Sequence, residues 1–187
     1  MIRPLLVEVD EATIAAHLDR VTPWLVTTRA LQSAYRKALE DTADEVGEPH
    51  IRGWLREIAG PAREHEAAVD DLYRAFGHQP PAPDLVGRAG SLVSSVLGTA
   101  RELVGEVQGR VAGARGRAWR QMRMLLLANL DATSGFAVAE QLGIALGRPA
   151  VVDIAFPIVA DKTRHQLLIR ECFLEMAANA ILYQRDV

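Results

Sequence analysis

The sequence is poor in cysteine, in aromatic residues and in long apolar runs, and each shortage excludes a class of protein. Its one cysteine, Cys172, cannot form an internal disulfide. The N-terminal segment contains two acidic residues before any long apolar stretch, so it does not resemble a signal peptide. We therefore expect a cytoplasmic protein. No segment reaches the roughly 18 apolar residues that span a bilayer, so we expect no membrane helix. Aromatic residues make up 5% of the chain, and alternating runs of Val, Ile, Thr and Tyr are almost absent, which argues against sheets.

What is present favours one helical domain. Of the 187 residues 49% are hydrophobic, with many Ala and Leu, and this length suits a single core. The net charge of −3 implies no general attraction to polyanions. Only two of the 21 basic residues are lysines, Lys37 and Lys162. Such a preference for arginine is typical of GC-rich coding sequences, so arginine clusters carry reduced weight here.

Apolar residues recur every three or four positions in four stretches, which predicts four long helices. We expect these at about 23–46, 49–76, 117–147 and 149–183, with a kink or split at Pro61 and an early interruption at Pro157. Asp10 should cap a separate short helix at 11–20. Residues 1–22 are then an N-terminal extension, and residues 23–187 form a bundle of two hairpins. The hairpins are joined by a crossover at 78–116 that contains a short helix at about 88–107.

Three segments carry a resemblance to a known family. They read AVDDLYRAFGHQP at the end of the second helix, AEQLGIALG at the end of the third, and PAVVDIAFPIVADKTRHQLL after it. These segments resemble the stress-response, Yci-type branch of the ferritin-like proteins. The resemblance implies a ferritin-like four-helix bundle, often a homodimer, with a carboxylate metal site in its metal-binding members.

Carried over position by position, the resemblance places few metal ligands in this chain. The family's ligand positions fall on Gln32; on Glu57, Ile58 and Ala62; on Asn129; and on Asp161 and Lys162. Only Glu57 and Asp161 are carboxylates, whereas a site for two hard cations needs about four. We therefore expect a degenerate centre without metal or other cofactor, in a structural or binding protein related to stress.

Two alternatives remain from the residues themselves. Glu57, Glu140, Asp161 and His165 lie on or near inward stripes, and a rearranged set of this kind would make the chain an iron- or manganese-dependent oxidase or peroxidase. A basic run would instead bind anions or nucleic acid, and it consists of Arg110, Arg115, Arg117, Arg120 and Arg123.

Two histidines also lie on the apolar stripes. The register implied by the resemblance separates His65 from His165 by roughly 16 Å along the bundle, at ~1.5 Å per residue. They should then not share an ion, and each is expected to be a satisfied core histidine. Asp161 and His165, spaced i, i+4, are expected to pair with each other. Cys172 should be a buried, inert thiol.

The segment 88–107 also bears on assembly. Its apolar residues include Leu92, Val96 and Leu103, but its glycines weaken it as an isolated helix, so its apolar face needs a surface to cover. We therefore predict a homodimer with this segment at or near the contact.

Overall fold

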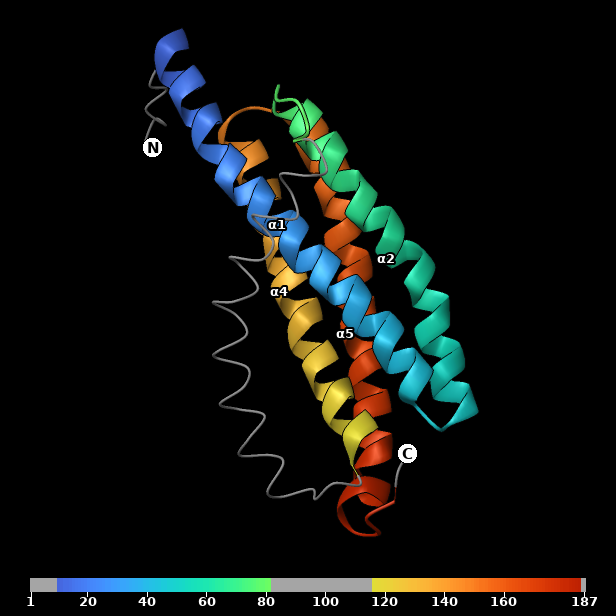
Figure 1. The fold of residues 1–187 in the computed structure, drawn as a ribbon. Coiled ribbons are helices and arrows are strands. Elements are labelled where there is room, and N and C mark those ends of the chain that lie inside the picture. The colour runs from blue at the N-terminus through green and yellow to red at the C-terminus, as the bar shows by residue number, and fades with distance from the viewer. Residues whose placement is uncertain (1–9, 82–115, 186–187) are drawn as a thin grey trace, which may run out of the picture.

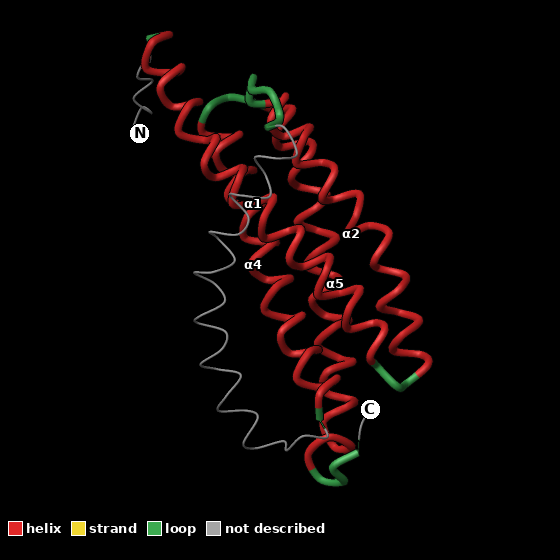
Figure 2. The backbone as a smooth tube through the Cα atoms, viewed as in Figure 1, coloured by secondary structure: helices red, strands yellow, loops and turns green. Residues whose placement is uncertain are grey.

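The computed structural model describes residues 10–81 and 116–185, and these residues form four long helices (Figure 1). The helices are α1 (Glu11–Glu45), α2 (Pro49–Ala75), α4 (Arg117–Ala145) and α5 (Pro149–Ile181). Within the described ranges there is no strand, and only short turns separate the helices of each pair (Figure 2). The expectation of an all-α protein is therefore confirmed. None of these four helices is long and apolar enough to cross a membrane.

The helices are arranged as two antiparallel pairs (Figure 1). α1 packs against α2 and α4, and α5 packs against the same two helices. α2 and α4 run in the same direction, so the chain between them joins opposite ends of the bundle. Most of this connection lies outside the described residues, and with it the helix expected at 88–107.

The N-terminal part differs from the prediction. Asp10 does cap a helix, since its Oδ1 accepts a hydrogen bond from the Thr13 amide at 2.8 Å. That helix, however, does not end at Arg20, because α1 continues through Pro23 to Glu45. A proline removes one backbone hydrogen bond. Val21 and Leu25, on either side of it, are 2% and 0% exposed and belong to one core cluster, so their packing outweighs that loss.

The two later prolines were also overestimated as helix breakers. α2 is continuous across Pro61, and α5 is continuous across Pro157. Buried residues flank each proline, and they hold the helix on both sides of the missing bond. α2 and α4 end instead beside glycines: Gly77 and Gly147 have φ of 88° and 63°, and each closes a Schellman motif.

The core consists of two apolar clusters. One fills the half of the bundle that holds the α1–α2 turn and includes Leu39, Leu55, Met122 and Ile169. The other fills the opposite half and includes Val21, Val69, Phe136, Val151 and Ile158. Between the two clusters, side chains of all four helices form a buried polar layer: Thr28, Gln32, His65, Asn129 and Lys162. This layer is the most unusual feature of the core.

Small residues and the indole groups bring α4 close to its neighbours. A Cβ added at Gly143 would lie 2.8 Å from the Val151 side chain, and one at Gly135 would lie 3.1 Å from that of Thr28. Trp24 Nε1 donates to the Gly135 carbonyl, and Trp119 Nε1 donates to the Phe173 carbonyl, each at 3.1 Å. Glycine in α4 therefore permits close packing against Thr28 of α1 and Val151 of α5.

Candidate functional site

Lys162 lies at the centre of the polar layer. Its side chain is fully buried at 0% exposure, because position 162 falls on the inward stripe of α5. The Nζ atom lies 3.5 Å from Asn129 Oδ1 and 4.0 Å from the centre of the Tyr35 ring. No ion pair joins Lys162 to a carboxylate in the described part of the chain. Burial lowers the pKa of Lys162 from 10.5 to about 7.

Asn129 links α4 to α5 at the same level. Its Nδ2 donates to the Lys162 carbonyl at 3.0 Å and to Gln166 Oε1 at 2.7 Å. These bonds orient the amide so that Oδ1 faces the Lys162 ammonium. Asn129 thus occupies a position where the resemblance places a glutamate, and it supplies one neutral oxygen to the centre instead of a carboxylate.

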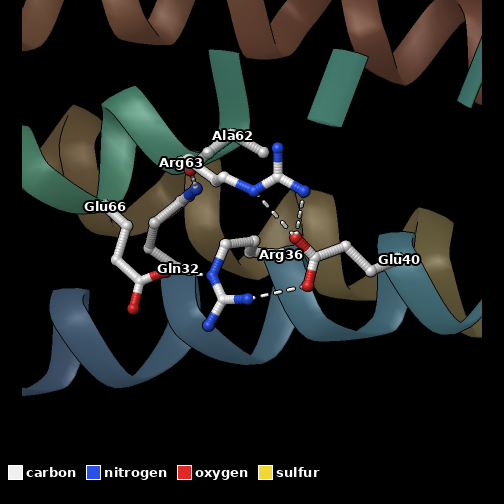
Figure 3. A network of polar contacts seen from close by, with 6 residues as sticks. All are labelled: Gln32, Arg36, Glu40, Ala62, Arg63 and Glu66. Carbon is white, nitrogen blue, oxygen red and sulfur yellow. Dashed lines mark hydrogen bonds and ion pairs between the residues drawn. The ribbon is translucent and has the colours of Figure 1, made fainter. Parts of the chain in front are cut away.

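Gln32 makes the equivalent link between α1 and α2. Its Nε2 donates to the Ala62 carbonyl at 2.8 Å, as Figure 3 shows. Its Oε1 is buried and has no hydrogen-bond partner among the described residues. Beside it, Arg36 pairs with Glu66 and, at 2.8 Å, with Glu40 (Figure 3). This partly buried salt-bridge network closes the α1–α2 seam next to the polar layer.

The two histidines meet, contrary to the sequence prediction. The rings of His65 and His165 stack with their centres 6.2 Å apart, and Asp161 Oδ2 lies 3.6 Å from His65 Nε2. The α2 residue level with Asp161 is therefore His65, one to two turns beyond the positions assumed from the resemblance. The separation of roughly 16 Å at ~1.5 Å per residue was wrong because axial register depends on how side chains interlock, which spacing within one helix does not reveal.

Both imidazoles are held neutral at ordinary pH. Burial is the main cause, and the charge of Lys162 adds to it, so the pKa of each falls from 6.5 to about 4. The Nδ1 atoms of His65 and His165 are buried and have no hydrogen-bond partner among the described residues. The expectation of satisfied core histidines is therefore wrong for these atoms. Asp161 also pairs with Arg164, in addition to lying near His65, rather than forming the expected contact with His165.

The rearranged metal set is not assembled. Glu57 is exposed and Glu140 is half-buried, whereas Asp161 and His165 lie at the polar layer. In the described ranges no three side chains of His, Cys, Asp or Glu come together as a metal site requires. The chemistry of the polar layer also fits a pair of hard cations poorly, because among the described residues Asp161 is the one carboxylate placed beside its amides and imidazoles, and the Lys162 ammonium would repel a cation.

The basic run is only partly described. Arg110 and Arg115 lie outside the described residues. Arg117 pairs with Glu45 at 2.8 Å, and the Arg123 Nη1 atom is buried. Arg117, Arg120 and Arg123 thus begin α4, but they do not present one free row of guanidinium groups.

Cys172 is fully buried, as the sequence predicted, and burial is the main cause that raises the pKa of its thiol to about 11. A thiol with so high a pKa is almost entirely protonated near neutral pH, which agrees with the inert role expected for it.

Sequence reasoning missed two members of the centre. Neither Tyr35 nor Gln166 is singled out from the sequence. Their spacing from Gln32 and Lys162, i+3 and i+4, is the signal that places them beside those residues. The candidate site is therefore the buried polar layer together with Tyr35, His165 and Gln166. Comparison with protein-family models, curated proteins and solved structures finds no match to this chain.

Proposed function

We propose that this chain is a ferritin-like, stress-related protein whose polar centre holds a lysine ammonium in place of metal, and that it acts as a structural or binding protein. The observation that carries the proposal is the full burial of Lys162 at a position where the resemblance places a metal-binding acid. The two antiparallel pairs with parallel α2 and α4 also agree with the ferritin-like connection of hairpins (Figure 1).

The charges of the polar layer give the reason why it would not bind metal. Gln32 and Asn129 bring neutral amides where a di-metal centre needs negative charge. Lys162 brings a positive charge, and two like charges at about 4 Å repel by roughly 4 kcal/mol at an effective dielectric constant of 20. The amides and the lysine connect the helices in pairs, a structural task that metal ligands would otherwise perform.

Metal analysis tests this proposal. We expect the purified chain to contain less than about a tenth of an equivalent of iron or manganese. Added Fe(II) or Mn(II) should leave its Tm unchanged, because the polar layer offers a cation no set of carboxylate ligands. Two equivalents of either metal per chain would overturn the proposal. Peroxide consumption that needs Fe(II) and disappears in Asp161→Ala would favour the oxidase or peroxidase alternative. A salt-sensitive shift with DNA or RNA would favour nucleic-acid binding.

A homodimer is the second part of the proposal. Exposed large hydrophobic side chains gather on the second helix pair, where Leu127, Leu130 and Val138 of α4 and Phe156, Leu167 and Leu174 of α5 are 36–60% exposed. By contrast, Trp54 of α2 is the one residue of this kind on the described parts of α1 and α2. Asn129 and Gln166 are in contact across the α4–α5 seam, and helical periodicity turns both exposed stripes to the outer side of that seam. Large contiguous apolar patches on a protein surface mark interaction sites.

The dimer is tested by light scattering at micromolar concentration. We expect the mass of two chains for the native protein, and of one chain for Leu167→Asp, because a charge in the middle of the α5 stripe would be desolvated on association. Trp54→Asp on α2 is the matched control and should remain dimeric. If Val96→Asp dissociates the dimer while Leu167→Asp does not, the contact lies at 88–107. A monomeric native chain would end this part of the proposal.

A further inference from the structure

We propose that the polar layer binds one small monovalent anion, such as chloride, against the Lys162 ammonium. The inference rests on the metal-free centre proposed above, because a bound metal would leave no place for Lys162. The proposed ligand is an anion, whereas a metal centre would bind cations. The residues that would hold it come from α1, α2 and α5.

The first argument is that Lys162 lacks a counter-ion. A buried charge is normally paired, because an unpaired buried charge strongly destabilises the fold. Asp161, its neighbour in sequence, is engaged with Arg164 and lies near His65. The described chain therefore does not supply the negative charge that a buried ammonium requires.

The second argument is that Lys162 has unused hydrogen-bonding capacity. An ammonium carries three donors. Lys162 uses one in a long contact of 3.5 Å to Asn129 Oδ1, and its other neighbour is the face of the Tyr35 ring. At least two N–H groups thus lack a good acceptor within the described residues, although the side chain is 0% exposed.

The third argument is that side chains near Lys162 carry unpaired polar atoms: the Tyr35 ring faces the ammonium, and the charge of Lys162 contributes to the lowered pKa of both His65 and His165. The Tyr35 hydroxyl and the Nδ1 atoms of His65 and His165 are buried without partners among the described residues. A hydroxyl donates one hydrogen bond, and a neutral imidazole donates one from Nδ1 in the appropriate tautomer. Gln32 Oε1 is an acceptor and does not itself favour an anion, but these potential donors outnumber it. A single buried positive charge suits a monovalent anion, since a dianion would leave an uncompensated charge inside.

The chain offers an unusually clean experiment, because Lys162 and Lys37 are its only lysines. Lysine labelled with ¹⁵N at Nζ and ¹³C at Cε should give two side-chain signals, and exposed Lys37 serves as the internal control. Sodium chloride replaces sodium fluoride at constant ionic strength and pH 6. Fluoride is the reference because its tight hydration shell opposes burial.

We expect the Lys162 signal to shift saturably with chloride while the Lys37 signal stays in place. Full replacement should raise Tm by on the order of 5 °C, as mass action requires for a ligand bound only to the folded state. The rise should vanish in Lys162→Met and persist in Lys37→Met. Equal behaviour in both salts, or a chloride effect that survives in Lys162→Met, would overturn the inference. Neither of these results requires metal in the protein, so failure here is distinguishable from failure of the proposed function.

Discussion

Acidification from pH 6.5 to pH 4 should lower the free energy of unfolding by several kcal/mol through His65 and His165. The pKa of each lies near 4 in the fold and near 6.5 when unfolded, so the unfolded chain binds more protons throughout this window. The contribution of the two histidines to stability is therefore complete above pH 6.5 and is lost as the pH falls from 6.5 through 4. Each unit of pKa shift corresponds to about 1.4 kcal/mol. Because His165 is half-buried and screened by water, we expect on the order of 3–5 kcal/mol for the pair.

Urea unfolding at pH 7, 5.5 and 4 measures this dependence. The charged groups near the two rings are Asp161, Lys162 and Arg164, all on α5. Carboxylates elsewhere also respond to acid, so the variant His65→Leu separates the contributions and should lose about half of the dependence between pH 6.5 and 5. His50→Asn, at an exposed histidine paired with Glu175, is the matched control and should retain it. A native chain whose stability is flat or rises on acidification would contradict the burial of neutral imidazoles.

Lys162→Met should stabilise the bundle by about 1–3 kcal/mol at pH 6 in chloride-free buffer, because replacing a buried charge by an apolar side chain of similar length removes a desolvation cost. The gain should shrink as the pH rises. The pKa of Lys162 is lowered from 10.5 to about 7, so the native chain itself becomes more stable between these values, as the unfolded chain binds the extra proton. Near pH 10 the two proteins should differ little.

Denaturant unfolding at pH 6, 8 and 10 provides the test. Lys37→Met, on the exposed face of α1, should change stability by less than about 0.5 kcal/mol at every pH. The loss of the 3.5 Å contact to Asn129 is a small counter-effect, because the contact is long. If Lys162→Met instead destabilises the bundle equally at all three pH values, then Lys162 stabilises the fold through its contacts, and the cost assigned to its charge is wrong.

Much of the fold could be predicted from the sequence because the responsible interactions are local. The recurrence of apolar residues every three or four positions placed α2 and α4 within about one or two residues of their ends. Asp10, Gly77 and Gly147 end or begin helices through backbone geometry and hydrogen bonds within a few residues. The same periodicity turned Gln32, Asn129 and Lys162 inward, and all three are buried.

Only the tertiary structure decided which helices stay continuous and which residues share a level. Pro23, Pro61 and Pro157 lie inside helices because packing on both sides of each proline, a non-local interaction, outweighs one lost backbone bond. His65 meets His165, and Asp161 approaches His65 rather than His165. The period of a helix determines the direction of each side chain around its own axis. The relative height of two helices is set by the interlocking of side chains from both, and no single helix contains that information.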